Sequence, residues 1–235
     1  MRRWRPHVRW YRFVSSELQK YAPTLVLNFI QYTGEITYTP VTATYPAGYY
    51  WGINVTDATY GSVGAETTVI PTSTAGIVDT GTTRRALFTY PHIHLSNTFI
   101  VVLLADDFFE SYMRAIPGAK LDHSTGLMTV PVSSVPQIQP LNFTIGGTVF
   151  SLDAAAQLIP MDQNTEWGLS ANKQYGIVSY LGTNSGEGLD FILGQKFMEM
   201  YYAVSLLDHG TITCAVLIDS QVFDTDSNRV GFAYT

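Results

Sequence analysis

From about Gln31 onward the chain consists of short segments rich in Thr, Tyr, Val and Ile, separated by Gly, Pro, Asn and Asp. β-branched and aromatic side chains favour strands, whereas the separating residues favour turns. No internal repeat and no low-complexity segment accompanies this pattern. The sequence therefore predicts an all-β fold with a few short helices.

Four segments give the clearest strand signals. Gly34–Val41 and Tyr49–Val55 each combine β-branched with aromatic residues. Phe143–Leu152 predicts a hairpin that turns at its Gly-Gly pair, because glycine adopts positive φ without strain. Val222–Tyr234 predicts a second hairpin, which turns around its Asp-Ser-Asn sequence.

Helix signals are few. Asp106 and Asp107 suit a helix N-terminus, where carboxylates interact favourably with the helix dipole. Apolar residues follow them at helical spacing as far as Ile116. Two shorter helices are expected near Leu152–Leu158 and Gln195–Met200.

Charge and cysteine content exclude several classes of protein. The net charge is −6, yet the first 20 residues hold six basic residues and one acidic residue, so the remainder is strongly acidic. Such a body repels phosphate backbones, which argues against nucleic-acid binding. A single Cys excludes a disulfide scaffold, and the absence of paired-Cys and HExxH motifs excludes common zinc sites.

Neither a leader nor a membrane span is expected from the sequence. The basic stretch Met1–Arg12 is not followed by the apolar run of a signal peptide. The most apolar later stretch, Ile100–Ala105, is far shorter than the roughly 20 residues of a membrane helix. We therefore expect no membrane association.

The motif that points most directly to chemistry is Asp-Thr-Gly-Thr at residues 79–82, directly after an apolar strand-like pair. Such a strand delivers the Asp79 carboxylate to a tight loop. Thr80 and Thr82 offer hydroxyl donors, and Gly81 lets backbone or substrate approach the carboxylate closely. This loop suits a pair of carboxylates that shares one proton and activates water.

Four ordered segments together carry a resemblance to a known family. They are YWGIN (Tyr50–Asn54), TAGIVDTGTT (Thr74–Thr83), SGEGLDFILG (Ser185–Gly194) and FDTDSNRVGFA (Phe223–Ala233). Across most of residues 31–235 the chain resembles the C-terminal lobe of a pepsin-like aspartic protease of peptidase family A1. The resemblance is strongest to the fungal, cysteine-poor, polyporopepsin-like group.

The resemblance implies a two-lobed β fold in which each lobe supplies one Asp from an Asp-Thr-Gly loop to a peptide cleft. Asp79 matches the second catalytic Asp, and its supporting loop is Thr80, Gly81 and Thr82. The strand Ile192-Leu193-Gly194 resembles the one that braces this loop from behind.

The family also implies a reaction, a substrate class and a location. It is a family of endopeptidases that act at acid pH by water attack. The resemblance therefore predicts a protein or peptide substrate, secretion from the cell, and no cofactor or metal. In a secreted protein, the sequons at Asn54 and Asn142 are candidate glycosylation sites.

The chain departs from the family pattern at its start. Only one Asp-Thr-Gly occurs, and residues 1–30 form an atypical basic segment with no counterpart of the N-terminal lobe. We therefore expect this chain to supply one lobe and one catalytic Asp, with the N-terminal lobe missing and no activity on its own. A homodimer that pairs two copies of Asp79 is the less favoured arrangement.

The match is also interrupted twice, by residues 84–102 and by residues 204–221. Both stretches can be encoded with intron-like ends, and removing 18 codons at each place restores continuous family text. We therefore expect both to be inserts from retained introns in a fungal gene.

Other interpretations remain open at this point. A lobe with half a cleft could be a non-catalytic module that binds peptides or pairs with a separate lobe. An aspartate-nucleophile phosphatase is disfavoured because Gly81 stands where that class needs a second acid. His92 and His94 lack further metal ligands nearby in sequence, and Cys214 lies in an apolar run typical of inert thiols.

Overall fold

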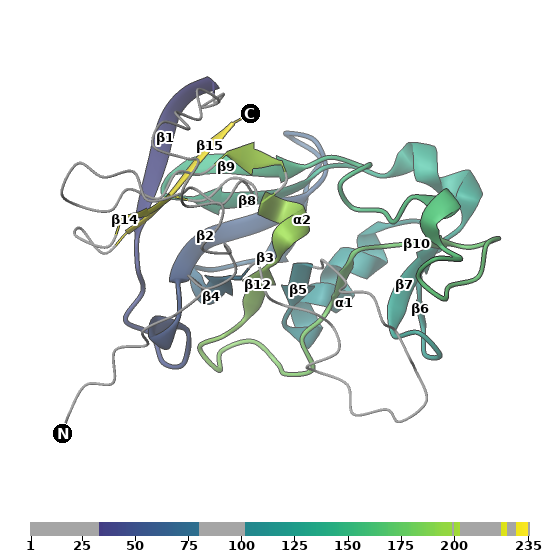
Figure 1. Ribbon diagram of the computed structural model, residues 1–235, viewed down its shortest axis with the longest axis horizontal. Helices are drawn as coiled ribbons and strands as arrows, with labels where there is room; N and C mark the ends of the chain where they lie inside the picture. The colour runs from purple at the N-terminus through teal and green to yellow at the C-terminus, as the bar shows by residue number, and fades with distance from the viewer. Residues whose placement is uncertain (1–32, 80–101, 199, 203–221, 225–228, 235) are drawn as a thin grey trace, which may run out of the picture. The chain divides into compact units, whose positions relative to one another are not determined.

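The computed structural model describes residues 33–79, 102–198, 200–202, 222–224 and 229–234. Strands dominate these residues, and the helices are short, so the predicted all-β class is confirmed (Figure 1). Residues 1–32 lie outside the described part.

The largest sheet has the strand order β11-β5-β12-β4-β2-β8-β9, and β3 also pairs with β2. Most neighbours are antiparallel, whereas β4 with β12 and β5 with β11 are parallel. The strands are β2 (Gly52–Tyr60), β3 (Thr67–Ile70), β4 (Thr74–Val78), β5 (Val102–Leu104), β8 (Leu141–Ile145), β9 (Thr148–Leu152), β11 (Val178–Tyr180) and β12 (Phe191–Leu193).

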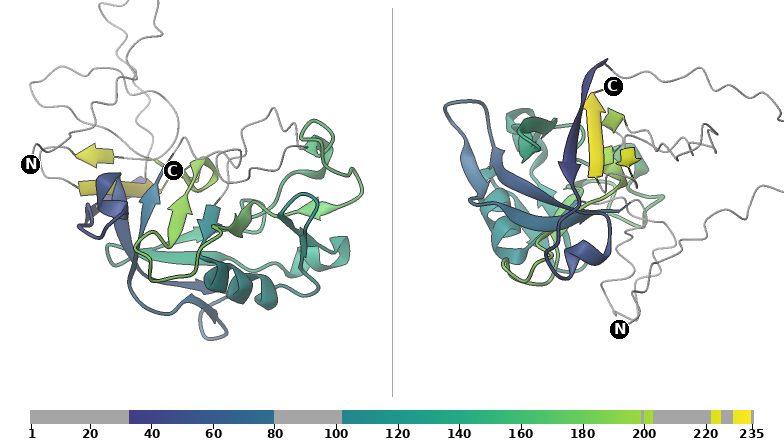
Figure 2. Two further views of the ribbon diagram at one scale, coloured as in Figure 1. Left: turned by 90° about the horizontal axis from the view of Figure 1, so that it is seen from below. Right: turned by 90° about the vertical axis from the view of Figure 1, so that its left-hand side faces the viewer.

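Two smaller sheets complete the strand framework. In one, β15 lies between β1 on one side and β13 and β14 on the other, and Figure 2 shows β1 and β15 running side by side. The other has the order β10-β7-β6. Their strands are β1 (Thr33–Pro40), β13 (Tyr201–Tyr202), β14 (Val222–Asp224), β15 (Arg229–Tyr234), β6 (Lys120–Asp122), β7 (Leu127–Val130) and β10 (Gln174–Tyr175).

Helix α1 (Asp106–Ala115) forms where the sequence predicts it, and it contacts β3, β5 and β11. Asp106 accepts the N–H of Gly182 at 2.7 Å, and Asp107 accepts the N–H and the hydroxyl of Ser185. The helix ends before Ile116, because the residue preceding a proline avoids helical backbone angles. The other helices are α2 (Gln195–Met198), η2 (Ala47–Tyr49), η4 (Val132–Gln137) and η5 (Met161–Gln163).

The predicted strands form, but one of them begins later than expected. Thr33–Pro40 and the hairpin β8–β9 form as expected, and the hairpin turns at Gly146 and Gly147, whose φ angles are 57° and 83°. The strand expected over Tyr49–Val55 begins only at Gly52, because the 3-10 turn η2 occupies the preceding residues. Strands β14 and β15 pair as predicted, and their turn, residues 225–228, lies outside the described residues.

Of the two predicted short helices, one forms and the other does not. No helix forms near Leu152–Leu158. Leu152 is the last residue of β9, and the backbone of Leu158 forms an antiparallel β-bridge with Gly176. The intervening turn is closed by Asp153, which accepts the N–H of Ala156 at 2.7 Å. The helix expected over Gln195–Met200 forms as α2, over Gln195–Met198.

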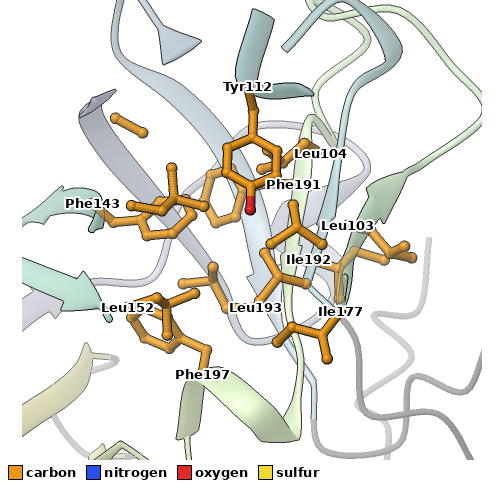
Figure 3. Close-up of a cluster of buried hydrophobic side chains, with 14 of the residues drawn as sticks. Leu103, Leu104, Tyr112, Phe143, Leu152, Ile177, Phe191, Ile192, Leu193 and Phe197 are labelled. Carbon is orange, nitrogen blue, oxygen red and sulfur yellow. The ribbon is translucent and has the colours of Figure 1, made fainter. Parts of the chain in front are cut away.

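Aromatic side chains connect the largest sheet with the sheet of β15. Phe150 of β9 lies 5.4 Å from Phe232 of β15 and 5.1 Å from Tyr201 of β13, between ring centroids. Phe197 of α2 meets Phe143 of β8 edge-on at 5.7 Å. The core continues through the leucines of β12 and β5, and Figure 3 shows these side chains converging.

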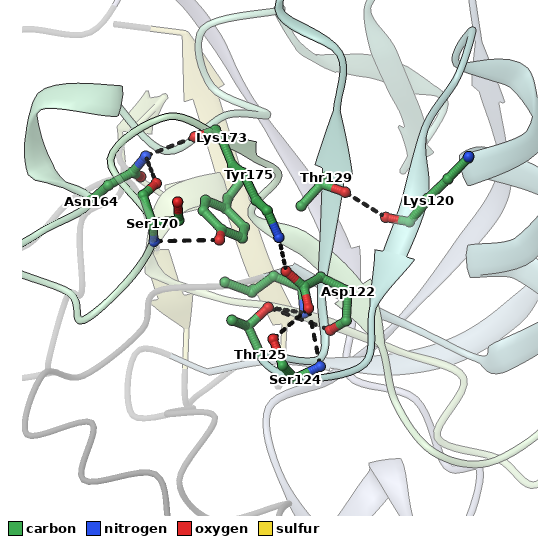
Figure 4. Close-up of polar contacts among 10 residues, drawn as sticks. Lys120, Asp122, Ser124, Thr125, Thr129, Asn164, Ser170, Lys173 and Tyr175 are labelled. Carbon is green, nitrogen blue, oxygen red and sulfur yellow. Dashed lines mark hydrogen bonds and ion pairs between the residues drawn. The ribbon is translucent and has the colours of Figure 1, made fainter.

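The sheet β10-β7-β6 is held to its neighbouring loop by polar contacts (Figure 4). Lys173 forms an ion pair with Asp122 at 2.9 Å, and Asp122 also accepts the hydroxyl and the N–H of Ser124. These hydrogen bonds, first from Ser124 and then from Lys173, lower the pKa of Asp122 to about 2. The buried Asn164 amide donates to the carbonyl groups of Ser170 and Lys173.

Candidate functional site

The predicted active loop begins at the end of β4, a strand buried between two neighbours. β2 pairs with β4 on one side, with Gly52 opposite Ile77. β12 pairs with it in parallel on the other side, with Leu193 opposite Val78. Ile77, Val78 and Leu193 are all buried. Successive residues of β4 point to opposite faces of the sheet and are all buried from Ala75 to Val78, so both faces are covered here.

Two backbone hydrogen bonds hold the end of β4. Val78 donates its N–H to the carbonyl of Trp51 at 3.1 Å, and Asp79 donates its N–H to the carbonyl of Leu193 at 3.1 Å. Asp79 therefore leaves the sheet from a position fixed on both sides. Its side chain is half-buried, so it is neither sealed in the core nor fully in solvent.

At their N-terminal ends, away from Asp79, β4 and β12 are joined by the carboxylate of Asp190. Asp190 is 1% exposed, and one of its oxygens, Oδ2, accepts the hydroxyl of Thr74 and the N–H of Gly186. The N–H of Asp190 in turn donates to the carbonyl of Ala75 at 2.8 Å. The two parallel strands are thus tied at their starts as well as beside Asp79.

Gly76 allows β4 and β12 to lie this close. A Cβ built on Gly76 would stand 2.3 Å from the carbonyl oxygen of Phe191 and 2.4 Å from its ring. No side chain fits without moving one of the strands. The glycine in the middle of β4 therefore helps to set the separation of the two strands that flank the candidate site.

In the largest sheet, β12 lies between β4 and β5, which follow one another in the chain among the described elements. The chain leaves the sheet at Asp79, and its next described residue, Val102, lies opposite Leu193 on the other side of β12. The central strand of this arrangement is the predicted bracing strand Ile192-Leu193-Gly194. Ile192 pairs with Ile77 and Leu193 with Val78, and the buried Gly194 directly follows β12.

Other predicted residues are placed differently. Thr80, Gly81 and Thr82 lie outside the described residues, as do His92, His94 and Cys214. Asn54 is exposed on β2, whereas Asn142 on β8 is half-buried and makes hydrogen bonds on both sides.

Sequence reasoning missed three contributors to this arrangement. They are the Trp51 carbonyl, Gly76 and the carboxylate of Asp190. Gly76 left a signal, since a glycine inside an otherwise apolar strand indicates a close backbone approach. The other two depend on which strands become neighbours, which local sequence does not specify.

Asp79 is a half-buried carboxylate at the end of β4, a strand that is paired on both sides. No group of three or more His, Cys, Asp or Glu side chains comes together among the described residues in a way that could hold a metal. Within the same residues, no helix has the length and apolar character to cross a membrane. A single carboxylate can accept or donate a proton, but activating water by a shared proton needs a second one.

Comparisons with known proteins agree on one family. The sequence model of the family "Eukaryotic aspartyl protease" matches residues 26–217. Polyporopepsin from Irpex lacteus is 43% identical over 205 residues, which cover 87% of this chain and 48% of that protein. Gastricsin from Rattus norvegicus is 28% identical over 202 residues, covering 86% of this chain and 39% of its own.

A solved structure extends this similarity to the fold. The crystal structure of an aspartic proteinase from Irpex lacteus matches with a TM-score of 0.66 and 41% sequence identity, over 87% of this chain and 48% of that one. The chain thus spans about half the length of polyporopepsin, and less of gastricsin.

Proposed function

Because this chain belongs to the eukaryotic aspartyl protease family, we propose that it supplies one lobe and one catalytic Asp, Asp79, of an aspartic endopeptidase. The observation that carries the proposal is the position of Asp79. Its N–H is bound by Leu193 at the end of a buried strand, and that strand is fixed to β12 at both ends. A catalytic carboxylate needs this kind of positioning.

The proposed chemistry needs a partner carboxylate from an N-terminal lobe. Aspartic proteases are the standard example of two close carboxylates that cannot both ionise and therefore share a proton. One acts as base toward water while the other acts as acid toward the peptide carbonyl. In this scheme Thr80, Gly81 and Thr82 support Asp79, and Ile192, Leu193 and Gly194 brace it.

The substrate class, pH range and location follow from the family. We propose a protein or peptide substrate, hydrolysis at acid pH and action outside the cell.

Proteolysis by the purified chain tests the half-enzyme proposal. We expect no cleavage of an acid-denatured protein between pH 2 and 5, because the chain has half a dyad. Cleavage that a pepsin-type transition-state inhibitor blocks, and that Asp79→Ala removes, would show that Asp79 finds a partner carboxylate in a homodimer. That result would overturn the proposal of a missing lobe.

The alternative function is a non-catalytic module that binds peptides or pairs with another lobe. It shares the fold and half the cleft but makes no use of the Asp79 carboxylate. Peptide binding that is unchanged in Asp79→Ala, without cleavage in any pairing, would favour it over the endopeptidase.

We also propose that residues 204–221 are an insert, and strand register supports this. β13 and β14 pair with the same side of β15 in one antiparallel direction. Tyr202 lies opposite Ala233, and Val222 lies opposite Gly231, so one position, opposite Phe232, separates them. Joining Ala203 to Val222 fills that position and removes residues 204–221. The boundary proposed from codons is therefore also the one that makes a single strand in register.

The geometry of the strands also supports the proposed insert at residues 84–102, beside the candidate site. Val78 and Val102 both lie opposite Leu193, hence two strand spacings apart, roughly 10 Å. At about 3.3 Å per extended residue, three residues span this distance. The five residues 79–83, which remain between Val78 and Val102 when residues 84–101 are removed, are therefore long enough. Val102, the last residue of the proposed insert, is the first residue of β5, so the removable part ends at residue 101.

Deletion variants test the insert at 204–221 with single-residue precision. We expect deletion of 204–221 to leave a folded chain with a melting temperature at or above that of the parent. Deletion of 203–221 removes one residue more and shifts β14 by one position, which turns its side chains to the opposite face. That control should melt lower. Equal melting of the two deletions would contradict the register argument.

A further inference from the structure

The chain has two sequons, Asn54-Val55-Thr56 and Asn142-Phe143-Thr144, and the fold treats them differently. Both lie on strands of the largest sheet, and both asparagines stand on the face opposite the apolar side chains of their strands. Sequence alone gives no reason to prefer one sequon over the other. The hydrogen bonds of the two asparagine side chains distinguish them.

The Asn142 amide is part of a polar ladder across three strands. Thr59 of β2 and Ser151 of β9 lie directly opposite Asn142 on its two sides. The Nδ2 of Asn142 donates to the carbonyl of Gly61 at 3.1 Å and to the hydroxyl of Thr59 at 3.5 Å, and its Oδ1 accepts the hydroxyl of Ser151 at 2.6 Å. A sugar on Nδ2 would replace one of its two hydrogens and push against the neighbouring strands.

The second half of this sequon is also engaged. Thr144 donates its hydroxyl to the carboxylate of Asp57 at 3.0 Å. The sequon at Asn142 is therefore built into the sheet at both of its polar positions. Freeing the Asn142 nitrogen would leave half-buried polar groups without their partners, which is costly.

Asn54 is in the opposite situation. It is exposed, and among the described residues its side chain makes no hydrogen bond. Thr56 is likewise exposed. Asn54 lines a pocket of about 220 Å³, whose other polar lining residues are Thr44, Ser73, Thr74 and Asp190. A sugar at Asn54 therefore meets an open pocket with polar lining residues, and no hydrogen bond of the Asn54 side chain with the described residues has to break.

We propose that Asn54 is the N-glycosylation site of this chain and that folded, secreted chains carry no glycan at Asn142. The modification uses a lipid-linked diphosphate oligosaccharide as donor. The Asn54 Nδ2 forms a bond to the anomeric carbon of the sugar, the bond from that carbon to the diphosphate oxygen breaks, and Nδ2 loses one proton. The lipid diphosphate is the leaving group.

The inference rests on the proposed extracellular location and deepens it, but its test does not depend on proteolytic activity. The full chain is secreted from yeast behind a heterologous leader. Glycan occupancy is read by peptide mass spectrometry after enzymatic deglycosylation in heavy-oxygen water, which labels each formerly glycosylated Asn. Absence of proteolysis would leave this readout unchanged.

Matched variants separate the two sites. Thr56→Ala removes the first sequon without removing a side-chain hydrogen bond among the described residues, and Thr144→Ala removes the second. Val63→Asn with Ala65→Thr, in the Thr56→Ala background, places a sequon at the exposed β2–β3 turn, where Val63 is 99% exposed. This control shows that the host modifies exposed sequons of this chain.

We expect the peptide with Asn54 to be labelled in the parent and the peptide with Asn142 to be unlabelled. Thr56→Ala should remove all glycan, and Thr144→Ala should leave the glycan on any chain that is secreted. Label at Asn142 in the secreted parent, or none at Asn54 while the control turn is modified, overturns the inference. The parent peptide map decides even if Thr144→Ala fails to fold.

Discussion

The β4–β12 pair and the small sheet β10-β7-β6 hold their strands in place by different interactions. Beside Asp79, the contacts are buried apolar side chains and backbone hydrogen bonds, with a glycine that lets the strands approach. At the small sheet, a loop is attached by the Asp122–Lys173 ion pair and by side-chain hydrogen bonds near solvent. Substitutions should therefore act through volume in the first region and through charge and pH in the second.

The largest effect is expected for Leu193→Ala. Leu193 is fully buried between Val78 and Val102, so the variant loses packing and leaves a cavity beside the strand that carries Asp79. We expect a loss of about 2–5 kcal/mol in the free energy of unfolding. Urea unfolding followed by circular dichroism measures it. Val149→Ala is the control, because Val149 is 47% exposed; a similar loss in both variants would contradict the packing account.

Gly76→Ala should be the next most damaging change. The added methyl group would overlap Phe191, and relief by strand movement costs about 1–3 kcal/mol. Gly182→Ala is a matched control, since its φ is +93° and no atom lies within 4 Å of the added Cβ. There the cost comes from the backbone alone, about 1 kcal/mol. If Gly182→Ala were the more damaging variant, strand separation would not depend on Gly76.

Asp122→Asn should have a smaller effect that depends on pH. Hydrogen bonds from Ser124 and Lys173 lower the folded-state pKa of Asp122 from 3.8 to about 2. The stabilisation by the charged form is therefore complete above the unfolded pKa and is lost as the pH falls through about 2. We expect the variant to melt a few degrees lower at pH 6, on the order of 2–4 °C. The difference should shrink toward pH 2, and one that grew in acid would have the wrong sign.

Arg114→Ala marks the low end of the scale. Arg114 pairs with Glu110 at 2.5 Å on α1, yet the two side chains are 72% and 52% exposed. Exposed pairs one helical turn apart contribute roughly 0.3–0.5 kcal/mol. We expect a loss of that size in urea, vanishing at 1 M salt. A loss above 1 kcal/mol would show that charge matters as much at α1 as packing does at β12.

What the sequence predicted well was local. The hairpin at Gly146 and Gly147 and the start of α1 follow from residues adjacent in the chain. The missed features are long-range. The β-bridge between Leu158 and Gly176 forms where a helix was predicted. β2 begins later than predicted because η2 precedes it, with the backbone of Ala47 against Gly52.

The candidate site divides in the same way. The motif predicts Asp79 as a site residue, and the resemblance predicts a bracing strand around Leu193, whose carbonyl accepts the N–H of Asp79. The roles of Asp190 and Gly76 became visible only once β4 and β12 were neighbours. The contrast between Asn54 and Asn142 depends likewise on cross-strand partners.

Asp79 as one half of a catalytic dyad is the central claim, and proteolysis by a chimera tests it most directly. The N-terminal half of polyporopepsin would precede residues 31–235 of this chain, with residues 84–101 and 204–221 deleted. We predict inhibitor-sensitive cleavage of an acid-denatured protein, lost in Asp79→Asn while the melting temperature stays within a few degrees. Cleavage that survives Asp79→Asn, or a folded chimera that neither cleaves nor binds the inhibitor, would contradict the claim.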